Sequence, residues 1–134
     1  MLLHQAGKSE GWSSGNFRQC LYSDCNVTND MRIAQEEIFG PVISMLTYKT
    51  NEEVIQIAND TVYGLHAFVS STNIERANRV ARQIDAGRGL INFVGHDPLA
   101  PFGGFKQSGI GREYGVFGFE QYVEPKALLG DVQD

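Results

Sequence analysis

The chain has 134 residues with a formal net charge of −5, and 42% of the residues are hydrophobic. This composition is typical of a soluble globular protein with one core, and the negative charge argues against nucleic acid or an anionic membrane as a partner. No apolar run reaches the roughly 20 residues that span a bilayer, and residues 1–7 are too poor in apolar side chains for a signal peptide. Two cysteines are too few for a disulfide scaffold, so we predict a cytoplasmic protein.

The first part of the chain carries little pattern. Residues 1–15 are rich in Gly and Ser and are predicted to form a loop or tail, and residues 17–23 favour an edge strand. Cys20 and Cys25 lack the second ligand pair that a metal site needs. A nucleophilic role would need a partner base, so we expect two structural thiols and no metal site.

The segment 35–42 places two carboxylates, Glu36 and Glu37, next to an aromatic turn. Gly40 and Pro41 are predicted to form a turn before a strand over 42–48. A Glu with Phe39 two residues on could bind a ribose, because the carboxylate accepts hydroxyl hydrogens and the ring packs against the sugar. From these eight residues alone, a solvated Glu pair ahead of a buried strand is the favoured alternative.

The middle of the chain alternates between strands and helices. Thr50 or Asn51 is predicted to cap a helix that ends at Asn59–Asp60. Asn73 is predicted to cap a second helix, over 74–86, that ends before Gly87. Apolar runs predict strands at 65–70, buried on both faces, and at 89–94. This order predicts an α/β fold with an open, mostly parallel sheet and crossover helices.

The segment 95–112 is rich in Gly and Pro and follows the end of a strand, where open α/β sheets bind ligands. It contains neither a P-loop nor a Gly-x-Gly-x-x-Gly phosphate motif. We therefore predict an ordered loop that lines a pocket or a domain interface. A short helix is expected over 113–119, and an extended segment over 121–129 that could pair with another subunit.

Four segments, in order and at close to the expected spacing, resemble the C-terminal part of the NAD(P)-dependent aldehyde dehydrogenase superfamily. They are Gln-Glu-Glu-Ile-Phe-Gly-Pro-Val at 35–42, Ala-Asn-Asp-Thr-Val-Tyr-Gly-Leu at 58–65, Ala86-Gly87 leading to Ile91-Asn92, and Pro-Phe-Gly-Gly-Phe-Lys-Gln-Ser-Gly-Ile-Gly-Arg-Glu at 101–113. The resemblance runs from about Gly15 to the end of the chain. It implies that residues 16–120 are the second half of a catalytic domain, and that residues 121–134 hold an oligomerisation strand.

The resemblance also implies roles for single residues. Glu37 resembles the residue that hydrogen-bonds the nicotinamide ribose of NAD or NADP. Phe39 resembles the aromatic residue whose ring packs against that ribose and the nicotinamide. The loop 93–102 is similar to the one that shapes the aldehyde tunnel, with Phe93, His96 and Phe102 as substrate-binding residues. The implied partners are an aldehyde and further subunits, either copies of this chain or a larger chain.

The residues that perform the family's chemistry have no counterpart in the segments that match. The family uses a Cys that forms a thiohemiacetal, a general-base Glu, an oxyanion-binding Asn and a dinucleotide domain, all upstream of the matched region. Cys20 follows Arg18-Gln19 and is not in the family's Gly-Gln-x-Cys setting. We expect no catalytic residue in this chain and no activity when it is alone. Three hypotheses remain: a piece of an aldehyde dehydrogenase, one subunit of a split enzyme, or a non-catalytic module that pairs with full-length subunits.

Overall fold

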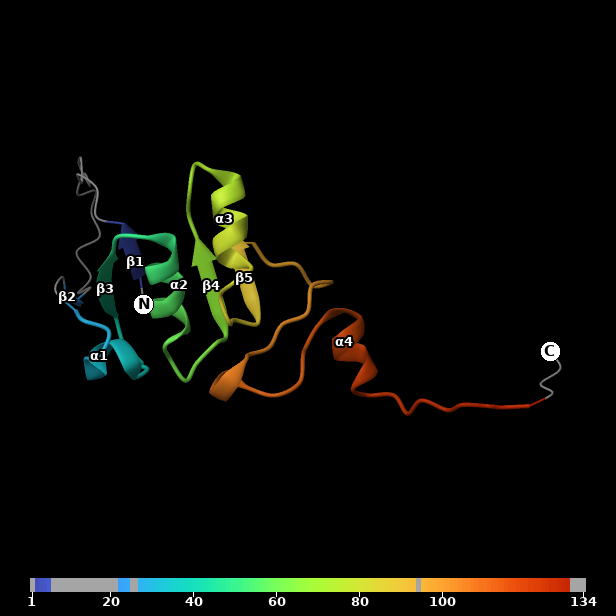
Figure 1. Ribbon diagram of the computed structural model, residues 1–134. Coiled ribbons are helices and arrows are strands. Elements are labelled where there is room, and N and C mark those ends of the chain that lie inside the picture. Colours follow the sequence, from blue (N-terminus) through green and yellow to red (C-terminus); the bar gives the residue numbers. More distant parts are fainter. Residues whose placement is uncertain (1, 6–21, 25–26, 94, 131–134) are drawn as a thin grey trace.

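The computed structural model describes residues 2–5, 22–24, 27–93 and 95–130 (Figure 1). Cys20 and Cys25, and most of the edge strand predicted over 17–23, lie outside the described residues. The strands are β1 (Leu2–Gln5), β2 (Tyr22–Asp24), β3 (Val42–Tyr48), β4 (His66–Val69) and β5 (Arg88–Ile91). The helices are α1 (Arg32–Gln35), α2 (Asn51–Asn59), α3 (Ile74–Ala81), the 3-10 helix η1 (Lys106–Ser108) and α4 (Gly115–Glu120).

The strands form two parallel sheets. One has the order β1-β3-β2, and the other pairs β4 with β5, with His66 opposite Arg88. The pairings between the described strands are parallel, so the predicted α/β class with a partial parallel sheet is confirmed. The chain passes from β3 through α2 to β4, and from β4 through α3 to β5, as the strand–helix alternation predicted.

Helix α2 begins where the sequence predicts it. The Thr50 hydroxyl accepts the Glu53 amide at 3.2 Å, and the Glu53 carboxylate accepts the Lys49 amide at 2.6 Å. The main-chain amides at the N-terminus of a helix have no carbonyl partner within the helix. Both bonds give an amide at or just before this end a side-chain partner, and this stabilises the helix. At the C-terminus of the helix, the Asp60 amide donates to the carbonyls of Gln56 and Ile57.

Helix α3 is shorter than the predicted range of 74–86. Asn73 caps it as expected, because its side chain accepts the Arg76 amide at 2.9 Å. The helix ends at Ala81, and the amides of Gln83 and Ile84 then bond to carbonyls only three residues back. This tightened turn replaces the last helical turn that the apolar spacing suggested.

Two segments at the start of the chain differ from the predictions. β1 (Leu2–Gln5) is a strand where a loop or tail was expected, because it pairs with β3 over Met45–Tyr48. α1 (Arg32–Gln35) is a short helix in a segment for which no helix was predicted. Pairing with a distant strand is a tertiary contact, which local composition does not report.

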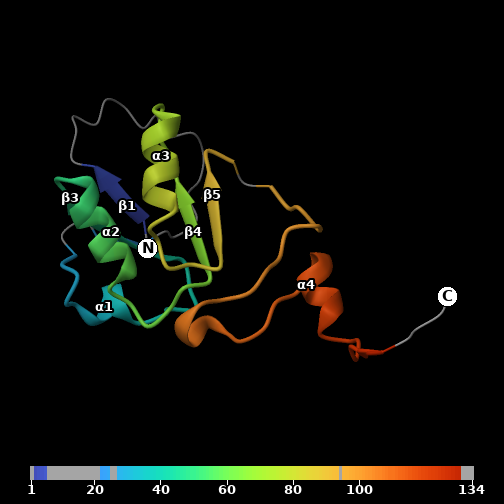
Figure 2. The same cartoon turned by 45° about the vertical axis from the view of Figure 1, so that its right-hand side comes forward.

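The prediction that β4 is buried on both faces is wrong. The Phe68 side chain is 51% exposed, and His66 is also exposed. Helix α3 packs against β4 and β5 and covers one face of this sheet (Figure 2). The described core is correspondingly small, with Leu46, Val54, Ala77 and Val80 among its buried apolar residues.

The C-terminal part leaves the sheets. Figures 1 and 2 both show α4 and the segment after it extending away from the rest of the molecule. Residues 123–129 belong to no strand in the structure. Within the described part of the chain, no helix is both long and apolar enough to cross a membrane.

Candidate functional site

The two adjacent carboxylates have different neighbours. Arg32 donates to Glu36 through Nε at 2.8 Å and through Nη2 at 2.9 Å, four residues apart on and after α1. This bidentate pair holds the pKa of the Glu36 carboxyl below its usual range. The Glu37 carboxylate has no protein partner among the described residues, so it is available to a ligand.

The turn after Glu37 presents an aromatic ring to solvent. The Gly40 amide bonds to the Ile38 carbonyl at 2.8 Å, and the Val42 amide to the Gly40 carbonyl at 2.8 Å. Phe39 lies on this turn and is 95% exposed. A phenyl ring so exposed has a whole face free to pack against another molecule.

A pocket of about 900 Å³ lies beside this turn. Its wall includes Glu37, Tyr48 on β3, His66 on β4 and Ser108 of η1, and apolar side chains of α2 and α3. Phe39, Phe93, His96 and Phe102 are not among its lining residues. The pocket therefore has the Glu37 carboxylate and residues of β4 in one wall, whereas the predicted substrate residues do not line it.

Two of the predicted substrate residues are linked through a third aromatic ring. The ring centroids of His96 and Tyr114 are 5.1 Å apart, and those of Phe102 and Tyr114 are 6.3 Å apart. The ring centroids of Phe102 and His66 are 6.2 Å apart. Phe93 is 67% exposed, and its ring covers Gly95, where a Cβ would meet it at 1.9 Å.

Tyr114 was missed by sequence reasoning. It lies at the N-cap of α4 with a φ of 62°, directly before Gly115 at 59°. A non-glycine residue in this region is uncommon and often marks a constrained site. The sequence carries a partial signal, since Tyr-Gly before an apolar run suggests a turn.

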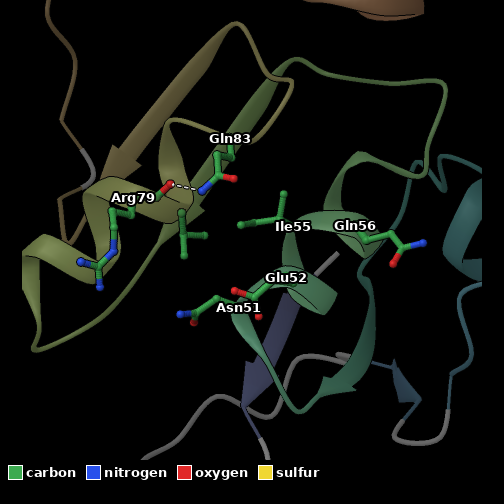
Figure 3. Close-up of a pocket in the computed structure, with 7 residues that line it drawn as sticks. Asn51, Glu52, Ile55, Gln56, Arg79 and Gln83 are labelled. Atoms are coloured by element: carbon green, nitrogen blue, oxygen red, sulfur yellow. Dashed lines mark hydrogen bonds between the residues drawn. The ribbon is translucent and has the colours of Figure 1, made fainter.

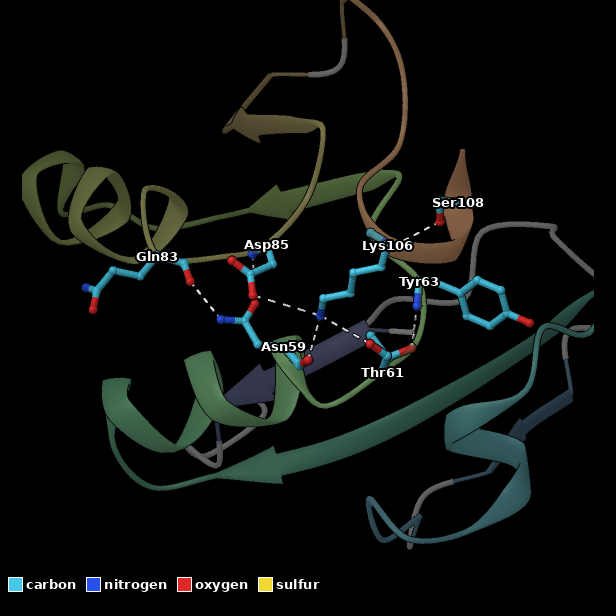
Figure 4. Close-up of polar contacts among 8 residues, drawn as sticks. Asn59, Thr61, Tyr63, Gln83, Asp85, Lys106 and Ser108 are labelled. Atoms are coloured by element: carbon cyan, nitrogen blue, oxygen red, sulfur yellow. Dashed lines mark hydrogen bonds and ion pairs between the residues drawn. The ribbon is translucent and has the colours of Figure 1, made fainter. Parts of the chain in front are cut away.

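Lys106 was also missed, and it fixes η1 against the end of α2 (Figure 4). Its ammonium donates to the carbonyls of Asn59 at 2.7 Å and Thr61 at 3.1 Å, and lies 3.9 Å from the Asp85 carboxylate. A cation at the C-terminus of a helix is favoured by the helix dipole. The Gly64 amide donates to Ser108 at 2.9 Å and adds a second tie.

A smaller pocket of about 350 Å³ lies between α2 and α3 (Figure 3). Figure 3 shows Asn51, Glu52 and Gln56 on α2, with Arg79 and Gln83 opposite them. The Gln83 amide group donates to the Arg79 carbonyl at 2.9 Å. None of the predicted site residues lines this pocket, so the candidate site lies at the larger one and at the aromatic cluster.

Comparison with known proteins gives a consistent result. The model of the aldehyde dehydrogenase family matches residues 5–128. A Staphylococcus haemolyticus protein named "Putative aldehyde dehydrogenase" is 53% identical over 125 residues, which is 92% of this chain and 26% of that protein. The chain thus spans about a quarter of the length of the curated relatives that it matches.

Solved structures extend the likeness to the fold. Aldehyde dehydrogenase C from Pseudomonas syringae, solved as a mutant with NAD+ and octanal, is 54% identical with a TM-score of 0.71, over 76% of this chain and 21% of that one. Betaine aldehyde dehydrogenase from Staphylococcus aureus, solved with NAD+, is 48% identical with a TM-score of 0.69, over 75% of this chain and 20% of that one.

Proposed function

This chain belongs to the aldehyde dehydrogenase family, and from that premise we propose that it supplies the C-terminal part of the catalytic domain of an NAD(P)-dependent aldehyde dehydrogenase. The observation that carries the proposal is the family match over residues 5–128. The complete enzyme oxidises an aldehyde to a carboxylic acid in the cytoplasm. Residues 16–120 belong to the catalytic domain, and 121–134 pair with another subunit.

The residues on the cofactor side fit a nicotinamide ribose. Glu37 places its carboxylate on the pocket wall without a protein partner among the described residues, and a carboxylate accepts hydrogen bonds from two neighbouring hydroxyl groups. The exposed Phe39 ring on the same turn offers an apolar face for the sugar or the nicotinamide. When bound, the cofactor would supply the hydride acceptor, and Glu37 and Phe39 would hold and orient its nicotinamide ribose.

The residues on the substrate side are aromatic. Phe102 and His96 both contact Tyr114, and Phe93 exposes most of its ring. We assign these side chains to the wall of the aldehyde passage. Aromatic walls bind apolar aldehydes through buried area and exclude water from the reacting carbonyl.

The nucleophile and the general base come from another part of the enzyme. The 134 residues contain no Gly-Gln-x-Cys sequence, so the chain alone is expected to be inactive. The alternatives are a subunit of a split enzyme and a non-catalytic module that pairs with full-length subunits. Turnover that appears only when a separate Cys-bearing chain is added supports the split enzyme, and mixed oligomers without added turnover support the module. NAD reduction by the purified chain alone contradicts the proposal.

The cofactor assignment is tested by two matched variants of the complete enzyme that contains this segment. Glu37→Gln removes a charged acceptor of two hydrogen bonds, so we expect NAD binding to weaken about tenfold or more. Glu36→Gln is the control, because Arg32 already occupies that carboxylate. Isothermal titration with NAD measures both. Equal effects of the two variants would contradict the role of Glu37.

A further inference from the structure

Arg88, the first residue of β5, binds the loop that leads to Phe102. Its Nε donates to the Pro101 carbonyl at 3.0 Å, and its Nη2 donates to the carbonyls of Ala100 at 2.7 Å and Asp97 at 3.2 Å. Three main-chain carbonyls of one loop thus converge on one guanidinium group. Hydrogen bonds from a charged donor are stronger than neutral ones.

The same guanidinium group lies over aromatic rings. Its central carbon is 5.1 Å from the centroid of Phe102 and 6.0 Å from that of Tyr114. His66 lies directly opposite Arg88 in the β4–β5 register, and its ring centroid is 6.2 Å from that of Phe102. The Phe102 ring therefore contacts the first residue of each of the two paired strands.

The loop itself is ordered by its own bonds. The Leu99 amide bonds to the Asp97 carboxylate at 2.9 Å, and the Gly115 amide to the Pro98 carbonyl at 3.2 Å. Phe102 and Glu113 exchange main-chain hydrogen bonds at 2.8 and 2.6 Å. These bonds fix the shape of loop 97–102 and tie it to the segment before α4, while Arg88 links it to the sheet.

We propose that Arg88 is a positioning residue that sets the place of loop 97–102 and of the Phe102 ring, and that it thereby determines which aldehydes fit. The inference rests on the proposed function, because Phe102 is the assigned wall residue. A lysine cannot replace this arginine fully: its ammonium is a point donor, whereas the planar guanidinium both bridges several carbonyls and stacks on a ring.

The first experiment follows amide hydrogen exchange in the 134-residue chain. Arg88→Met keeps a long side chain but removes every donor, so exchange at the Ala100 and Phe102 amides should accelerate about tenfold or more, with a smaller effect for Arg88→Lys. Arg82→Met is the control, because Arg82 is an exposed cap residue of α3. Unchanged exchange in Arg88→Met overturns the positioning role.

The second experiment measures specificity in the complete enzyme that contains this segment. Over linear aldehydes from two to eight carbons, Arg88→Met should change the ratio of kcat/KM between the shortest and the longest substrate by about tenfold, the scale of a reshaped apolar pocket. The change should appear mainly in KM for the aldehyde, with the KM for NAD unchanged, and Arg88→Lys should restore part of it.

The outcomes separate this inference from the proposed function. A uniform loss of kcat/KM for all aldehydes in Arg88→Met overturns the specificity role. If the unmodified enzyme oxidises no aldehyde, the proposed function fails and the specificity role falls with it. The exchange experiment still decides whether Arg88 positions the loop.

Discussion

Arg32 makes the two neighbouring carboxylates at 36 and 37 unequal. It forms two hydrogen bonds with Glu36, and the pKa of Glu36 lies below its usual range because of this partner. The neighbouring Glu37 side chain has no such partner among the described residues. A local ion pair thus engages Glu36 and leaves the Glu37 carboxylate without a partner in the described part of the chain.

This difference gives a prediction about proton binding. Arg32→Gln removes the hydrogen bonds and the charge that lower the pKa of Glu36, so that pKa should rise towards the ordinary value for Glu. Since the folded pKa is lowered, the pair stabilises the fold above the unfolded pKa, and this stabilisation is lost as the pH falls through the folded pKa. A carboxyl ¹³C NMR titration measures the change, with Arg79→Gln as an exposed control. An unaltered Glu36 titration would refute the interaction.

At the scale of elements, β5 and the loop after it are joined by a close approach of two backbones. A Cβ at Gly87 would lie 1.6 Å from the Gly103 carbonyl oxygen. The Gly64 carbonyl accepts the amides of Gly87 at 2.9 Å and Phe105 at 2.8 Å. A side chain at Gly87 is therefore excluded by lack of space, and Gly87 directly precedes Arg88, which hydrogen-bonds to loop 97–102.

Alanine substitutions at Gly87 and Gly89 should differ in their effect on the stability of the fold. Gly87→Ala forces the loop away, and overpacking of this kind costs roughly 1–3 kcal/mol. Gly89→Ala is the matched control, because its Cβ would meet the nearest atoms of Ala81 at an ordinary 3.9 Å. Urea denaturation of the two variants measures the difference. Equal stability would show that the loop does not pack on Gly87.

At the scale of the whole molecule, much apolar surface remains exposed. Phe117 and Phe119 of α4 are 60% and 67% exposed, and Tyr122 and Leu129 in the following segment are 89% and 94% exposed. Contiguous exposed apolar residues mark surfaces that bind other proteins. This supports the proposal that residues 121–134 pair with another subunit.

We therefore expect the isolated chain to self-associate. Light scattering after gel filtration should give a mass above 14.8 kDa that rises with concentration, because association buries the exposed side chains. A double variant, Tyr122→Ser with Leu129→Ser, should shift the chain towards the monomer, whereas Glu124→Gln in the same segment should not. A monomer that unfolds cooperatively at all concentrations contradicts this expectation.

Local patterns were sufficient for much of the fold and for the family. Of the two caps predicted for α2, Thr50 is the one in the structure, and the cap predicted at Asn73 is confirmed, since capping depends on residues three positions apart. The strand at 42–48 was also predicted, because its apolar, β-branched run is continuous. The roles of Glu37, Phe39, Phe93, His96 and Phe102 remain predictions from the resemblance.

The sequence by itself determined the α/β class, the order of helices and strands from β3 to β5, and the membership of a family, because these follow from local periodicity and from motifs in series. Only the tertiary structure decided that Leu2–Gln5 pairs with β3, that β4 is open on one face, and that Arg88 holds the loop before Phe102. These features depend on contacts between residues that are distant in the chain. No local pattern encodes such contacts.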